Sequence, residues 1–104
     1  MSYLKSVLHE EYQRLKALVK KYNNEISALP RGSISIKKRN QKEYVYLAYR
    51  KKENVKFEYI GSISSEKSKN VVKKVKLRKG YEIKLKQVRK DLQEIEKVIN
   101  GRKL

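Results

Sequence analysis

The stretch YVYLAYRKKENVKFEYI, residues 44–60, decides the fold. Residues that favour β-structure fill both ends of it, and the polar run Lys51-Lys52-Glu53-Asn54 separates them. This pattern is typical of two antiparallel strands joined by a short loop. Asn54 is available for a left-handed backbone conformation in that loop.

The loop also predicts the register of the two strands, because cross-strand neighbours follow from one pairing. If Arg50 lies opposite Val55, then Tyr46 lies opposite Tyr59 and Ala48 lies opposite Phe57. This register gathers an aromatic cluster on one side of the hairpin. We expect that side to pack on a helix.

A third strand precedes the hairpin. Polar and apolar residues alternate from Ser33 to Ile36, which is the period of a strand. We expect a three-stranded antiparallel sheet over residues 33–61. The basic residues between the first two strands, Lys37, Lys38, Arg39 and Lys42, are expected in the connecting loop.

One helix is predicted before the strands along the chain and one after them. Apolar residues of the first helix, residues 2–29, alternate steps of four and three, and the helix should end at Leu29-Pro30-Arg31-Gly32. The second helix is predicted over residues 66–100, with an acidic first turn after Ser64-Ser65 and Gly101 after its end. The first stripe consists of Leu8, Tyr12, Leu15, Val19, Tyr22, Ile26 and Leu29.

The apolar stripe of the second helix changes direction near Gly80. Val71, Val72 and Val75 lie on one face, whereas a later stripe is rotated away from it, so we expect a kink or a change of packing partner there. The later stripe matches that of the first helix, which predicts antiparallel pairing. The fold class is therefore α+β, in the order α-β-β-β-α, as a single domain over residues 1–104. The later stripe consists of Tyr81, Leu85, Val88, Leu92, Ile95 and Ile99.

The net charge of +17 is concentrated in two segments. Residues 31–56 have nine basic and two acidic side chains, and residues 67–90 have eleven basic and one acidic. Residues 2–29, with five basic and three acidic, and residues 91–104, with three of each, are nearly neutral. This distribution predicts one electropositive end on a nearly neutral helical stalk, which is expected for a protein that contacts phosphates.

Three groups of residues are the candidate nucleic-acid contacts. Lysine outnumbers arginine in them, which favours neutralisation of the backbone over reading of bases. Tyr49 is the candidate for stacking on a base, because its side of the hairpin also carries Lys56. The groups are Lys37, Lys38, Arg39 and Lys42 in the first loop, Arg50, Lys51 and Lys52 in the hairpin turn, and Lys73, Lys74, Lys76, Arg78 and Lys79 in the second helix.

Residues for catalysis are scarce. The chain has no cysteine and a single histidine, His9, which lies beside two glutamates in a helix and is expected at the surface. Glu43, Glu53 and Glu58 do not have the spacing of a two-metal nuclease, and no phosphate-binding glycine motif occurs. We expect no enzyme activity, no metal and no cofactor. The chain also has no apolar run long enough for a membrane span, so we expect no membrane partner and a cytoplasmic location.

The central string LPRGSISIKKRNQKEYVYLAYRKKENVKFEYIG resembles a pattern in small uncharacterised bacterial and archaeal proteins. In those proteins LP-x-GSIS and a Y-x-YL-x-YR hairpin ending in YIG lie between two helical segments. The three short strands also resemble, more loosely, the arm-type DNA-binding domains of phage and transposon integrases, which present a three-stranded sheet to duplex DNA. Both resemblances imply a phage or mobile-element setting.

The leading hypothesis is a nucleic-acid-binding protein, with DNA favoured over RNA, that acts by phosphate contacts. The alternative is a protein-interaction module, such as an antitoxin or a nuclease inhibitor, that uses the helical hairpin. Ribosome association is a third hypothesis. The amphipathic helices also leave open a homodimer or another protein partner.

Overall fold

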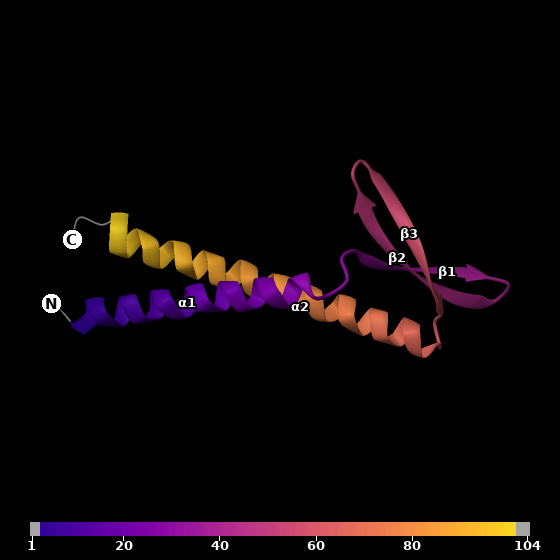
Figure 1. Cartoon of the computed structure of the whole chain (residues 1–104), viewed down its shortest axis with the longest axis horizontal. Helices are drawn as coiled ribbons and strands as arrows, with labels where there is room; N and C mark the ends of the chain where they lie inside the picture. The colour runs from indigo at the N-terminus through magenta and orange to yellow at the C-terminus, as the bar shows by residue number, and fades with distance from the viewer. Residues whose placement is uncertain (1–2, 102–104) are drawn as a thin grey trace. The chain divides into compact units, whose positions relative to one another are not determined.

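The computed structural model describes residues 3–101, and its order of elements is the predicted α-β-β-β-α (Figure 1). Along the chain, one long helix precedes a three-stranded antiparallel sheet and a second long helix follows it. The chain forms two compact units. One contains helix α1, Tyr3–Ser27, and helix α2, Glu66–Glu96, from Gly80 onward, and the other is Ala28–Lys79.

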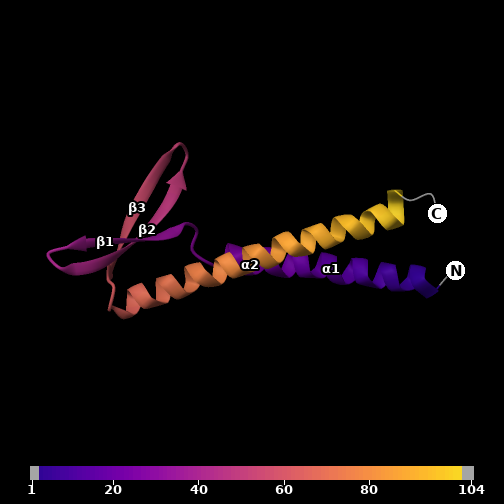
Figure 2. The same cartoon turned by 180° about the vertical axis from the view of Figure 1, so that it is seen from behind.

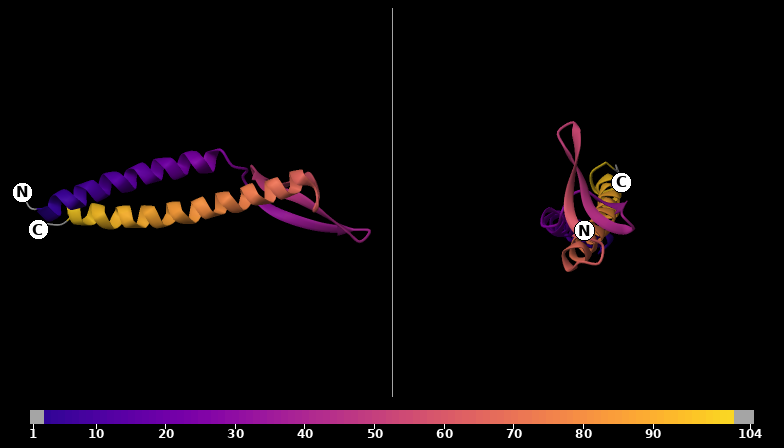
Figure 3. Two further views of the ribbon diagram at one scale, coloured as in Figure 1. Left: turned by 90° about the horizontal axis from the view of Figure 1, so that it is seen from below. Right: turned by 90° about the vertical axis from the view of Figure 1, so that its right-hand side faces the viewer.

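In the first unit, α1 and the later part of α2 lie side by side and antiparallel, as predicted (Figure 3). Leu15 and Val88 are buried, with 3% and 8% of their surfaces exposed. The rings of Tyr22 and Tyr81 are in contact, with 5.8 Å between their centres. The other described members of the two predicted apolar stripes on these helices are partly buried. This burial is what the predicted spacing of apolar residues requires of two paired helices.

Both helices end before the predicted residue. α1 ends at Ser27, two residues early, because Pro30 disfavours helical geometry just before it and Ser27 Oγ donates a hydrogen bond of 2.8 Å to the carbonyl of Asn24. α2 is α-helical only as far as Glu96, and a five-residue π-helix, Lys97–Gly101, follows it. The residue expected after the helix end, Gly101, is therefore the last residue of that π-helix.

The sheet has the order β1-β2-β3, with β1 at Ser33–Arg39, β2 at Lys42–Lys51 and β3 at Asn54–Ser62 (Figure 2). The predicted register of the second hairpin is confirmed, because Arg50 pairs with Val55 and the expected pairs follow. A β-bulge shifts the register between Val45, which pairs with Gly61, and Tyr46, which pairs with Tyr59.

Both turns are shorter than predicted. The first contains only Asn40 and Gln41, which both have positive φ, 49° and 67°. In the second turn the left-handed residue is Lys52, with φ 58°, and Asn54 pairs with Lys51 instead. Two-residue turns of this kind match the twist of the strands, and so each strand extends further than its apolar residues suggest.

The core of the Ala28–Lys79 unit joins one side of the sheet to the first part of α2. Val45, Leu47 and Ile60 form a buried cluster with Val75, which is 2% exposed. The expectation that the aromatic side of the hairpin packs on a helix is wrong. The aliphatic side packs there, because branched aliphatic side chains fill a close contact with a helix without a polar group to satisfy.

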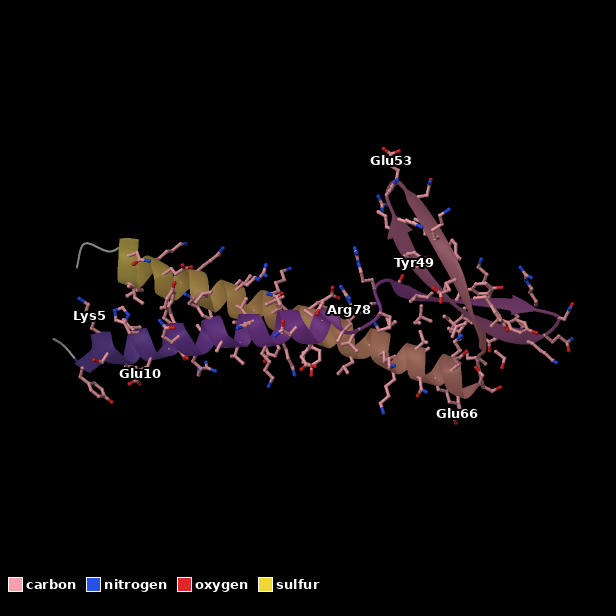
Figure 4. The ribbon with its side chains drawn as sticks, viewed as in Figure 1. Lys5, Glu10, Tyr49, Glu53, Glu66 and Arg78 are labelled. Carbon is pink, nitrogen blue, oxygen red and sulfur yellow. The ribbon has the colours of Figure 1, made fainter. Side chains whose placement is uncertain are left out.

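Two local features fix the ends of the sheet. At Gly32, with φ 108°, a Cβ atom would lie 2.3 Å from the carbonyl oxygen of Ala48, so only glycine fits. At the start of α2, Ser65 Oγ accepts a hydrogen bond of 3.1 Å from the backbone N–H of Ser68, which makes Ser65 the N-cap, as the Ser64-Ser65-Glu66 sequence predicted. Glu66 occupies the first turn (Figure 4).

Candidate nucleic-acid interface

The two sides of the sheet differ in charge. We call the side turned away from α2 the open face. Alternation along the strands, together with the register of the two strand pairs, places four basic and four aromatic residues there. Among the described strand residues the acidic ones, Glu43 and Glu58, alternate to the other side. The open face comprises Lys37, Arg39, Lys42, Arg50, Tyr44, Tyr46, Phe57 and Tyr59 with the small or apolar residues between them.

Three aromatic residues of the open face have rings in contact, and Phe57 is linked to them through Lys37. Tyr59 contacts Tyr46 edge-on, with 5.4 Å between ring centres, and Tyr44, with 6.1 Å. Phe57 and Tyr59 are each about half exposed, at 52% and 55%. The rings therefore present a wide apolar surface between cationic groups.

Lys37 lies over this cluster. Its Nζ atom is 4.7 Å from the centre of the Tyr46 ring and 4.3 Å from the centre of the Phe57 ring. Both distances are within the range of cation–π attraction. The contacts restrict the position of an ammonium group that would otherwise be mobile, and they hold a positive charge above the centre of the face.

The structure corrects the placement of the first two candidate groups. Lys37, Lys38 and Arg39 belong to β1 and Lys42 to β2, so none of them lies in a loop. Arg50 and Lys51 belong to β2, and Lys52 alone of that group lies in the turn. Glu53 is at the tip of that hairpin (Figure 4). The strands therefore divide these basic residues between the two sides of the sheet.

The alternation places Lys38, Lys51 and Lys56 on the side of the sheet that faces α2. Tyr49 is on that side too, partly buried against the core cluster, so its ring is less accessible than those of Phe57 and Tyr59. The residue expected to stack on a base is thus a packing residue. Phe57 and Tyr59 on the open face are the more exposed aromatic side chains. The sequence did not show which strand residues are exposed.

The third candidate group lies on the first part of α2. Lys73, Lys74, Lys76 and Lys79 are exposed. Arg78 is half-buried, and its Nη1 atom donates a hydrogen bond of 2.9 Å to the carbonyl oxygen of Leu29 (Figure 4). Arg78 therefore connects α2 to the segment before β1, which is a structural role. Because α2 packs on the other side of the sheet, the predicted contacts form two basic surfaces instead of one.

A sequence family described as a domain of unknown function, DUF6788, matches residues 8–69, which is more than half of the chain. The protein belongs to the DUF6788 family. The DUF6788 match takes in most of α1, the whole sheet and the first residues of α2. All eight basic and aromatic residues of the open face lie inside it, whereas Lys73, Lys74, Lys76 and Lys79 lie beyond its end.

No curated protein and no solved structure matches this DUF6788 chain. Within residues 3–101, no helix is both long enough and apolar enough to cross a membrane. The same part of the chain holds no group of three or more histidine, cysteine, aspartate or glutamate side chains placed to bind a metal ion.

Proposed function

We propose that the Ala28–Lys79 unit binds nucleic acid, DNA in preference to RNA, through the open face of its sheet. The observation that carries the proposal is the sorting of charge between the two sides of the sheet. The open face has four basic residues, the aromatic cluster and no strand carboxylate, whereas the other side has both strand carboxylates together with Lys38, Lys51 and Lys56. A requirement for solubility alone would not separate the charges in this way.

The dimensions of the sheet support a DNA duplex as the ligand. A narrow antiparallel ribbon fits into a major groove, where its side chains reach base edges while flanking cations meet phosphates. In such a complex, Arg39, Lys42 and Arg50 would neutralise phosphates. The aromatic cluster would contact apolar groups of the bases, such as the methyl group of thymine.

The test compares a variant of the open face with a variant of equal charge elsewhere. The first changes Lys37, Arg39, Lys42 and Arg50 to Gln. The control changes Lys20, Lys21, Lys86 and Lys90 to Gln, four exposed lysines of the helix pair. Fluorescence anisotropy with a labelled duplex of about 20 base pairs, at ~50 and ~200 mM salt, measures the affinity and its salt dependence.

The open-face variant should lose affinity by on the order of a hundredfold or more, and its salt slope should fall by about 3 to 4, because each lost phosphate contact lowers the slope by about 0.9. The control variant should lose only a little affinity for the duplex, because its total positive charge is lower. Equal losses in the two variants would show that total charge, and not this face, governs binding, and would overturn the proposal. Single-stranded DNA and hairpin RNA in the same assay should bind more weakly than the duplex.

A further inference from the structure

A second surface of the Ala28–Lys79 unit has a different chemistry. Between β1, β2 and the first part of α2 is a groove of about 610 Å³. Its floor is aliphatic, and two of the floor residues remain substantially exposed, Ile36 at 50% and Ile63 at 41%. The floor consists of Ile34, Ile36, Val45, Ile63, Val72 and Val75.

Four exposed lysines of α2 form the rim of the groove. Lys69, Lys73, Lys76 and Lys79 are spaced by four, three and three residues, so they follow one side of the helix. At 1.5 Å per residue the row is about 15 Å long. Among the described residues that line the groove, none is acidic. The rim charges therefore have no carboxylate beside them in the groove.

We propose that this groove binds an acidic amphipathic helix of a partner protein. The apolar side of such a helix would cover the aliphatic floor, and carboxylates at similar spacing would face the lysine row. The proposal concerns a different surface from the open face and does not depend on nucleic-acid binding there.

Charge and shape distinguish this occupant from others. In a second copy of this chain, none of the segments 2–29, 67–90 and 91–104 has an excess of acidic side chains to match the lysine row. A nucleic-acid backbone would satisfy the lysines but would leave the aliphatic floor largely uncovered. The groove is concave, which suits a projecting segment better than the plane of a lipid surface.

The experiment uses the full chain and a labelled synthetic peptide of about four helical turns, with Leu along one face and Glu on either side of it. Two control peptides separate the two contributions. One replaces Leu with Ser and keeps the charge, and the other has the same composition in scrambled order. Anisotropy should show binding of the first peptide with at least tenfold weaker binding of both controls.

The protein variants are matched for exposure and charge. Ile36→Glu puts a carboxylate in the groove, whereas Leu77→Glu puts one on α2 at a position that does not line the groove. Both residues are 50% exposed in the wild type. Because both positions are half exposed, both variants should fold. Ile36→Glu should weaken peptide binding at least tenfold, and Leu77→Glu should change it less than threefold.

Three results would overturn the proposal. The first is equal binding of the amphipathic and scrambled peptides, which would indicate attraction by charge alone. The second is an equal loss of affinity for the amphipathic peptide in the Ile36→Glu and Leu77→Glu proteins. The third is a loss of duplex DNA affinity in Ile36→Glu with unchanged peptide affinity, which would assign the groove to nucleic acid. The first two results do not bear on the proposed function. The third concerns the location of the DNA site, and the assay of the open-face variant shows separately whether that face binds DNA.

Discussion

The ammonium nitrogen of Lys37 lies 4.3 Å from the centre of the Phe57 ring, so a charge of the edge strand β1 is held against a ring from the opposite edge strand, β3. The contact spans the width of the sheet on its open face. It places the cation where a bound polyanion would meet it first, with the aromatic surface beneath.

Lys37→Gln should therefore weaken binding to duplex DNA several-fold and reduce the salt slope by about 1. Titrations at several salt concentrations measure both quantities. Lys20→Gln, at an exposed position of α1, is the control and should leave the slope unchanged. A Lys37→Gln protein with the wild-type slope would remove Lys37 from the interface.

Tyr49 and Tyr59 should respond differently to truncation, since Tyr49 packs against the core cluster and Tyr59 is 55% exposed. Tyr49→Ala should lower the free energy of unfolding by about 2 to 4 kcal/mol, and Tyr59→Ala by about 1 kcal/mol. Urea unfolding followed by circular dichroism measures the difference. A larger loss for Tyr59→Ala would contradict the assignment of the two faces.

Two glycines should give changes of opposite sign on substitution by alanine. Gly32→Ala should destabilise the protein by at least about 2 kcal/mol, because its Cβ would meet the backbone of Ala48 and its φ is positive. Gly80→Ala should stabilise it by about 0.5 to 1 kcal/mol, because Gly80 is inside α2 and a Cβ there meets nothing within 4 Å. Thermal unfolding of the two variants would show both signs, and a stable Gly32→Ala protein would refute the close approach.

Gln41 has a left-handed backbone conformation in a two-residue turn, which is unfavourable for a side chain with a Cβ atom. Gln41→Gly should stabilise the β1–β2 hairpin by about 0.5 to 1 kcal/mol and leave its register unchanged. Gln41→Ala serves as the control and should bring no gain. Denaturant unfolding compares the two, and equal effects would mean that the gain does not come from the turn.

Much of the fold could be predicted because local patterns determine it. The spacing of Leu15 and its neighbours predicts the helix pair, and the polar run after Arg50 predicts the register that brings Tyr46 opposite Tyr59. These features depend on residues close together in the sequence. Turn residues and helical periodicity are therefore sufficient to predict the helix pair and the register of the second hairpin.

The side of the sheet that is buried could not be predicted in the same way. It depends on the register of β1, in which Ile34 and Ile36 lie opposite Leu47 and Val45 and complete an aliphatic surface. A slip of one residue would place Ile36 opposite Tyr44, on the aromatic side. The sequence predicts a longer first turn than the structure has, so it does not predict the register of β1 against β2. Without that register, the division of the basic residues between the two sides of the sheet cannot be predicted either.

The sheet has an outermost strand on each side, β1 and β3, and each has one row of backbone groups without a neighbouring strand in the sheet. Such unpaired backbone groups can form hydrogen bonds with an edge strand of another molecule, which can begin aggregation. Lys37, Lys38 and Arg39 on β1 and Lys56 on β3 make that approach costly, since two copies would bring like charges together. The same positive charge on which the proposed nucleic-acid binding depends would thus also oppose self-association. A variant that lacks this charge should be tested for self-association before a loss of binding is interpreted.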